Sequence, residues 1–443
     1  MKYISKSLST LVATLCLISA LGTLPGLAEE NESQLRQRVS QQPDNPAARL
    51  QLANLLLERM RKDWAQRDPN ASGPVFQQQA DALQRQAQEL IALYEKVIAL
   101  QPANVEARVN LAEVYFVFLS QFDQAETLLK QALQSDPANS KALVAMAEFQ
   151  FFFKNDHAGA LKLLEQALQA HPDDPVLSIS LADLLTGASQ KPEDFARARQ
   201  VLEAALLKHP GHGGLGYMLA SVWYRDASLS QPMNPEKAQK ALDLYLTELN
   251  ARPEFELIIE VAQVAQSMGR LAQARHLIED GIKVYPDEPR LRLLLGDLWL
   301  QQGAAALDQG QVSPEIVQAE EIYRGLLPQA QLGRLVSAQQ VQLYYNLGLL
   351  AFLRGQAEKA QPAKALPHYQ ESERMYRQAM AIFDRINIIN RPLQQELAKT
   401  LEAIGQIYVG QAGQAQAVEY YKQACGFKLE SSCTWLKQQG MGQ

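Results

Sequence analysis

Two histidines near the middle of the chain have a spacing that suits a shared metal ion. His209 and His212 lie in the segment HPGHGG, and imidazole nitrogens are common ligands of zinc. His171 stands before a proline at an equivalent place further up the chain. A metal site needs more ligands, and the segment carries no third one. Histidines at helix ends also interact favourably with the helix dipole, so we interpret these three as helix-end residues and predict no metal site.

No sequence motif indicates catalysis. The chain has no G-x-S-x-G segment, no Walker-type phosphate loop and no dinucleotide-binding fingerprint. Its 42 Lys and Arg residues stand against 48 Asp and Glu residues, a formal net charge of −6, and they form no basic block. This balance argues against nucleic acids and anionic membrane surfaces as partners. We therefore predict a protein that is not an enzyme and uses no cofactor.

The N-terminus has the pattern of an exported protein. Lys2 and Lys6 precede an apolar run from Leu8 to Leu21, and small residues lead to Ala28. This order is typical of a secretory signal, here residues 1–28, cleaved after Ala28, and it predicts a periplasmic or secreted protein. The alternative is an uncleaved membrane anchor, but the run is shorter than the about 20 apolar residues that span a bilayer. We expect no membrane span once the signal is removed.

A phased pattern of prolines and small residues occupies most of the remaining chain. Prolines follow the ends of expected helices at nearly regular intervals, at Pro102, Pro137, Pro172, Pro210, Pro253 and Pro286. A large residue followed by a small one recurs in phase with them, and the small residues are Ala53, Ala112, Ala147, Ala182, Ala220, Ala262, Gly296, Gly348 and Gly405. Small residues let two helix axes approach closely, so the pattern predicts repeated pairs of helices.

These residues resemble the tetratricopeptide repeat, a helix-turn-helix unit of about 34 residues. The resemblance implies an all-α fold, a right-handed α-solenoid of about nine helix pairs over residues 29–425, closed by a capping helix. The clearest unit is the last, which carries Ile404-Gly405, Tyr408, Ala417, Tyr421 and Ala424. The repeats are expected near residues 45–101, 103–136, 138–171, 173–209, 212–252, 254–285, 287–330, 338–390 and 394–427.

Several of the expected repeats are longer than the family unit. The additional residues fall between the paired helices, at Asp68 to Pro74, Asp226 to Pro235, Gly303 to Pro314 and Gly355 to Pro367. Pro, Gly, Asn and Ser in these segments predict loops. Insertions at one structural position of a solenoid project along one edge, so we expect a long-loop edge.

The resemblance also implies a concave groove lined by the first helix of each pair. The residue after each small position, and those one turn further along, would face this groove. Three consecutive repeats would place carboxylates there, a surface that suits a peptide bearing Lys or Arg. Aromatic side chains would add cation–π attraction of about 0.5–1 kcal/mol. The candidate partner-binding residues are Asn54, Glu113, Phe116, Glu148, Phe151, Phe152, Asp183, Tyr224 and Asp297.

A second interpretation of the same residues is structural. The carboxylates then form a solvated helix face and the phenylalanines pack between repeats. Family members that clamp a C-terminal carboxylate use Lys, Asn and Arg, and only Asn54 matches that pattern here. The function that the resemblance implies is an extracytoplasmic scaffold or adaptor that holds a protein or peptide partner, including one with basic residues, in the groove. The alternative is an envelope-assembly or cell-wall-associated scaffold that uses the long-loop edge.

The C-terminal segment is similar to a related helical repeat. Tyr420-Tyr421, Ala424-Cys425 and Cys433 match one cysteine-bearing unit of the Sel1-like repeats, which pair two cysteines across neighbouring helices. The resemblance implies a Cys425–Cys433 disulfide, which suits an oxidising compartment, and a Sel1-like capping segment over 426–443. A hydrolase role has been suggested for cysteine-rich Sel1-like proteins, but this sequence offers no nucleophile and base for it.

Overall fold

The computed structural model describes residues 31–66, 73–187, 189–308, 311–385, 389–411 and 413–441. Within these ranges all regular secondary structure is helical. The signal segment expected at residues 1–28 lies outside the described residues. Among the described helices, none combines the length and the apolar character needed to cross a membrane.

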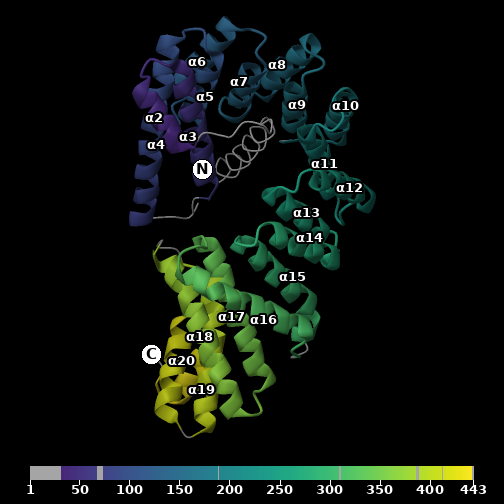
Figure 1. The fold of residues 1–443 in the computed structure, drawn as a ribbon. Coiled ribbons are helices and arrows are strands. Elements are labelled where there is room, and N and C mark those ends of the chain that lie inside the picture. The colour runs from purple at the N-terminus through teal and green to yellow at the C-terminus, as the bar shows by residue number, and fades with distance from the viewer. Residues whose placement is uncertain are drawn as a thin grey trace. The chain divides into compact units, whose positions relative to one another are not determined.

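The chain divides into two compact units, which Figure 1 shows in purple to teal and in green to yellow. Among the described residues, unit 1 holds 31–66 and Gln77–Arg252, and unit 2 begins at Pro253. The helices of unit 1 are α2 (Glu32–Gln41), α3 (Pro46–Gln66), α4 (Gly73–Leu100), α5 (Val105–Glu113), the π-helical turn η1 (Val114–Phe118), α6 (Phe122–Ser135), α7 (Ser140–Phe152), α8 (His157–Ala170), α9 (Pro175–Gly187), α10 (Pro192–Lys208), α11 (Gly213–Ser228) and α12 (Pro235–Ala251). Those of unit 2 are α13 (Phe255–Ser267), α14 (Leu271–Val284), α15 (Pro289–Asp308), α16 (Pro314–Gln331), α17 (Ser337–Ala357), α18 (Pro362–Arg385), α19 (Arg391–Gly410), α20 (Gln414–Gly426) and α21 (Glu430–Gln438).

Successive helices pack in pairs along each unit. In unit 1, α5 packs on α6, α7 on α8, α9 on α10 and α11 on α12. In unit 2, α13 packs on α14, α15 on α16, α17 on α18 and α19 on α20. The first helices of neighbouring pairs also contact each other: α5 contacts α7, and α7 contacts α9. The predicted all-α architecture of solenoid-like helix pairs is confirmed for the described residues.

The segments between pairs both end one helix and start the next. Asn104 caps α5, where its side-chain oxygen accepts a hydrogen bond of 2.8 Å from the backbone N–H of Ala107. Asn139 caps α7 through a matching bond of 3.1 Å from Ala142. Such a cap contributes about 1 kcal/mol, and the proline two residues earlier cannot continue the preceding helix. The repeated Pro-x-Asn segments therefore set the start of the first helices.

The small residues lie where paired helices cross. Ala53, Ala112, Ala147, Ala182 and Ala220 are fully buried in unit 1. In unit 2, Ala262 holds the first of these positions and glycines hold the next three, where tyrosine rings of the second helices lie against Gly296, Gly348 and Gly405. A β-carbon on Gly348 would stand 2.7 Å from the ring of Tyr376, whose side chain is completely buried. The glycines are thus required by close helix packing.

We expect Gly348→Ala to destabilise unit 2 by about 1–3 kcal/mol, because the new methyl group would overpack a core that has no space for Tyr376 to move. Gly325→Ala is the matched control, since Gly325 lies in α16 and a β-carbon added there would have no heavy atom within 4 Å. There the gain in helix propensity should leave stability equal or higher. Urea unfolding of the full chain measures both, and equal midpoints for the two variants would contradict this account.

Two of the expected loops, those that begin with a glycine, begin inside a helix instead. We placed loops at Gly303 to Pro314 and Gly355 to Pro367, but α15 continues to Asp308 and α17 to Ala357. The expectation was wrong because these glycines serve packing rather than turns. A β-carbon at Gly303 would lie 2.6 Å from Ile316, and one at Gly355 would lie 2.6 Å from Tyr369.

The chain ends in a short helix that packs on the last pair. Cys425 of α20 and Cys433 of α21 form a disulfide. The rings of Tyr421 and Trp435 stack with centroids 4.0 Å apart, and Leu436 is buried beside them. The covalent link and the stacked rings hold α21 against α20, as expected for a helix that covers the end of an apolar core.

Candidate functional site

Three carboxylates lie at one position of three consecutive first helices. Glu113 ends α5, Glu148 belongs to α7 and Asp183 belongs to α9, and each follows a fully buried alanine. We call these three residues the acidic row. Glu113 and Glu148 are each 5% exposed, and the side chain of Asp183 is 19% exposed. They are therefore not a freely solvated helix face, which was the structural alternative for the carboxylates.

An arginine from an earlier helix neutralises one end of the row. Arg61 of α3 donates from Nε to Glu113 Oε1 at 2.7 Å, and its Nη2 binds the second carboxylate oxygen. Both side chains are buried, with 8% and 7% exposure. Arg61 also pairs with Glu58 through Nη1. A two-point guanidinium–carboxylate contact with little water around it is a strong ion pair.

A second arginine pairs with the other end. Arg225 of α11 donates from Nη2 to Asp183 Oδ1 at 3.2 Å. This pair is more exposed than the first, with side-chain exposures of 30% and 19%. The two arginines lie on α3 and α11, so the row runs from one cation to another across the first helices of unit 1.

Glu148 lies between the two pairs, and no hydrogen bond contributes to the shift of its pKa. Burial raises the pKa of its carboxyl to about 8, and the negative charges of Glu113 and Asp183 act in the same direction. Arg61 opposes this shift, but its guanidinium is already bound to Glu113 and Glu58. Glu148 is therefore a buried acid without a counter-charge of its own, and it holds its proton at neutral pH.

Asn54 and Asp297 make bridges between repeats. The side-chain oxygen of Asn54 accepts hydrogen bonds from the Tyr94 hydroxyl at 3.0 Å and from Asn110 at 2.9 Å. Its amide donates to Glu106 at 3.0 Å. All of these partners come from the second helix of the same pair or the first helix of the next. Asn54 therefore contributes to the joint between pairs.

Asp297 has the same arrangement in unit 2. Its Oδ1 accepts from the Tyr323 hydroxyl at 2.6 Å and from Asn346 at 2.9 Å, and Gln342 binds Oδ2. Burial raises the pKa of Asp297 to about 6, although the hydrogen bonds from Tyr323 and Asn346 act against the rise. The position one residue after the small one thus carries a polar bridge in both units.

Two of the phenylalanines that we expected to face the groove are buried in the core instead. Phe116 is 1% exposed and packs against Phe149 and Phe153, with ring centroids 6.0 and 5.3 Å apart. The π-helical turn η1 begins directly after Glu113, so the residues beyond it do not keep the face that Glu113 occupies. Phe151 is 5% exposed and stacks on His157. For these two, packing between repeats describes the structure, and their expected exposure is corrected.

Phe152 and Tyr224 remain partly exposed. Phe152 packs at the junction of two core clusters, and its ring meets that of Phe151 with centroids 5.0 Å apart. Tyr224 is half-buried on α11, and its carbonyl accepts a hydrogen bond of 2.9 Å from the Ser228 hydroxyl. These two are the aromatic candidates that a partner can reach.

The histidines of the HPGHGG segment bind backbone groups. The Nε2 of His209 lies 2.6 Å from the carbonyl oxygen of Asp173, and His212 caps α11 through a 3.4 Å bond from Leu215. His171 follows the end of α8. Within the described part of the chain, no three His, Cys, Asp or Glu residues are grouped as metal ligands.

Sequence reasoning missed a buried acid at the start of the 226–235 segment. Asp226 is 2% exposed and binds both Arg199 and Lys237, the latter at 2.8 Å. Arg199 also lies over the ring of Trp223, 4.2 Å from its centroid. These contacts join α10, α11 and α12. Asp226 appeared in the sequence only as the first residue of an insertion, which gave no sign of its burial.

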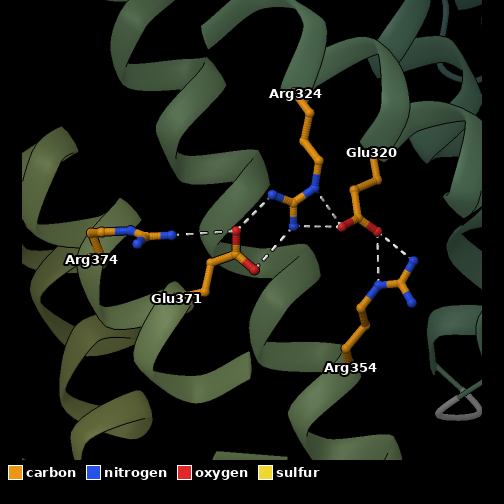
Figure 2. A network of polar contacts seen from close by, with 5 residues as sticks. All are labelled: Glu320, Arg324, Arg354, Glu371 and Arg374. Atoms are coloured by element: carbon orange, nitrogen blue, oxygen red, sulfur yellow. Dashed lines mark hydrogen bonds and ion pairs between the residues drawn. The ribbon is translucent and has the colours of Figure 1, made fainter. Parts of the chain in front are cut away.

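A second missed network ties three helices of unit 2. Figure 2 shows Arg324 of α16 between Glu320 of α16 and Glu371 of α18, with Arg354 of α17 on the other side of Glu320. Arg324 binds Glu371 with two bonds of 2.8 and 3.0 Å. The pKa of Glu371 is lowered by its hydrogen bond and charge contact with Arg324, which outweigh partial burial. The network links α16, α17 and α18 through charge-assisted hydrogen bonds.

Paired helices, small residues at their crossings and first helices that meet from pair to pair define a helical repeat protein, a class that serves as protein-binding scaffolds. Residues 115–175 and 261–308 match the family model of the tetratricopeptide repeat. These two segments therefore carry the tetratricopeptide repeat pattern, one in each unit. No curated protein matches it.

Several solved structures are similar to this chain. A thermophilic tetratricopeptide repeat protein of Thermus thermophilus is 22% identical, with 44% of this chain and 99% of that chain covered and a TM-score of 0.35. The human IFIT1 dimer with PPP-AAAA is 14% identical, with 90% and 78% covered and a TM-score of 0.43. PilW, a type IV pilus biogenesis factor, is 18% identical, with 49% and 96% covered and a TM-score of 0.37.

Proposed function

We propose that this protein is an extracytoplasmic scaffold that binds a protein or peptide partner on the face formed by the first helices of unit 1. The acidic row carries this proposal, because it gathers Glu113, Glu148 and Asp183 from three consecutive pairs on that face. Asn54 in unit 1 and Asp297 in unit 2 form hydrogen bonds to the first helix of the next pair, and these bonds hold neighbouring pairs in register. Half-buried Phe152 on α7 and Tyr224 on α11 supply apolar contact area on first helices of the same unit.

Two observations support the location outside the cytoplasm. The N-terminal residues have the order of a secretory signal. Cys425 and Cys433 form a disulfide, a bond that persists in oxidising compartments and is rare in the cytosol. We also propose that the final segment, which contains these two cysteines, is a Sel1-like unit.

Crosslinking of the full chain to partners in an envelope fraction, followed by mass spectrometry, tests the binding face. We expect crosslinks from lysines exposed on the first helices of unit 1, such as Lys62 on α3 and Lys141 on α7. Lys364 on α18 of unit 2 serves as the comparison site. Partner crosslinks that occur on unit 2 and spare Lys62 and Lys141 would overturn the proposed face.

A second candidate is an envelope-assembly or cell-wall scaffold that uses the long-loop edge. The observation in its favour is the segment between α11 and α12, whose start is anchored by buried Asp226 while Leu229 is 42% exposed. Deletion of Leu229 to Met233 keeps Asp226 and the α12 cap Asn234. Loss of partner capture by this deletion would favour the loop edge, and unchanged capture favours the first-helix face.

A further inference from the structure

We propose that Glu148 is the receptor for the ammonium group of one lysine side chain on the partner protein. This inference rests on the proposed function, since it assigns the chemistry of a partner that binds the first-helix face. It starts from the contrast between Glu148 and its two neighbours in the acidic row. Glu113 and Asp183 each have an arginine from this chain, and Glu148 has none.

The middle residue of the acidic row, Glu148, has no arginine of its own, whereas the residues on both sides have one. Glu113 is bound by Arg61 at two points, and Asp183 is bound by Arg225 through Oδ1. Glu148 is 5% exposed, and burial and charge alone, without a hydrogen bond, shift its pKa. A buried polar group without a partner costs free energy, because it has lost water and gained nothing in return. A cation from outside would satisfy it.

Without a bound partner, the Glu148 carboxyl keeps its proton and is neutral at pH 7. Glu113 on α5 and Asp183 on α9 add negative charge near Glu148, Arg61 on α3 is the opposing cation, and burial has the largest effect on its pKa. An ammonium group would displace that proton and restore the carboxylate. Buried acids with strongly shifted pKa values are concentrated at functional sites, which agrees with a binding role.

The chemistry favours lysine over arginine and over a metal ion. A guanidinium is a planar fork that uses two carboxylate oxygens side by side, as Arg61 does on Glu113. Because Glu148 is only 5% exposed, a compact ammonium on a flexible stem would need less space beside its carboxyl than a guanidinium fork. A metal ion needs several ligands, and the described residues contain no cluster of three or more metal-binding side chains.

The test is capture of envelope proteins on the immobilised full chain, with wild type, Glu148→Gln and Glu203→Gln compared. Glu203 is exposed on α10, so the control makes the same chemical change in the same unit away from the row. The extract is used untreated, guanidinated so that lysines become homoarginines while N-terminal amines stay free, or acetylated so that both amines are blocked. N-acetyl-lysinamide and N-acetyl-norleucinamide, which share a stem and differ in the ammonium, serve as competitors.

We expect Glu148→Gln to weaken capture on the order of 30-fold or more, as found when one partner of a buried charge pair is removed. Glu203→Gln should capture as wild type does. Guanidination should abolish capture, and N-acetyl-lysinamide should release the partner while the norleucine compound does not. Capture that survives guanidination and fails on acetylation would assign the site to an N-terminal amine and overturn the lysine proposal.

The failures of the two proposals are distinguishable. If Glu148→Gln captures the partner normally and the crosslinks still fall on Lys62 and Lys141, the lysine site is wrong and the binding face stands. If the crosslinks fall elsewhere, the proposed function itself is wrong. Circular dichroism of each variant shows whether the fold is kept, and a loss of capture by a folded Glu148→Gln protein is the supporting result.

Discussion

Glu148→Gln is expected to make the folded protein more stable at pH 8, by roughly 1–3 kcal/mol. Each unit of pKa shift corresponds to about 1.4 kcal/mol, and part of the gain is offset because a buried amide also lacks partners. The group that we assign to binding is thus expected to destabilise the empty protein. A purely structural role predicts the opposite sign.

The effect should depend on pH in a defined direction. The pKa of Glu148 is about 8 in the folded protein and near 4.5 in the unfolded chain, so the folded state binds more protons between these values. Stability of the wild type therefore falls as the pH rises from about 4.5 to about 8. Glu148→Gln removes this contribution, so the gap between variant and wild type opens over that window.

Urea unfolding followed by circular dichroism at pH 4.5 and pH 8.5 measures this gap. We expect similar midpoints at the lower pH and a clearly higher midpoint for the variant at the upper pH. Glu203→Gln should show no such change, because Glu203 is exposed. A gap that is equal at both pH values would show that Glu148 is not protonated in the folded protein.

Arg61→Met is expected to be strongly destabilising, by about 3–5 kcal/mol, the range for breaking one side of a buried ion pair. Methionine fills part of the space, but Glu113 would remain 5% exposed without its two bonds. The change would also remove the positive charge that lowers the pKa of Glu148. Unfolding free energies from urea titration give the size of the loss.

The double variant Arg61→Met with Glu113→Gln separates charge from packing. Neutralising Glu113 removes the unpaired charge, so the double variant should recover part of the stability that the single variant loses. Arg59→Met is a suitable control, because Arg59 pairs with Glu32 at the surface and such pairs contribute about 0–1 kcal/mol. A loss below about 1 kcal/mol for Arg61→Met would falsify the strong buried pair.

Much of the helical scaffold was predictable because its signals are local. Asn104 and Asn139 cap helices through backbone groups three residues away, and the preceding prolines stop the helix before. Glycine or alanine at a crossing is required wherever two axes approach closely, as Gly348 and Tyr376 show. The same rule misled us at Gly303 and Gly355, since a glycine that permits packing and one that permits a turn look alike in a sequence.

The sequence predicted which residues occupy the candidate site, but it did not predict their burial or their charge partners. The repeat phase placed Glu113, Glu148 and Asp183 at equivalent positions of three helices. It said nothing of burial, and it could not show the π-helical turn that directs Phe116 into the core. Charge partners were also hidden, because Arg61 and Arg225 occupy other positions of their helices.

His209 and His212 show the same difference between local signals and tertiary contacts. By sequence alone, spacing and composition determined a helical repeat, an acidic row at one repeat position and helix-end roles for His209 and His212, because each depends on neighbours within a few residues. Only the tertiary structure decided that Arg61 reaches Glu113 from a helix 52 residues away, and that Glu148 remains without a cation. Such pairings depend on how one helix pair is rotated on the next, and that rotation follows from the packing of all the side chains between them.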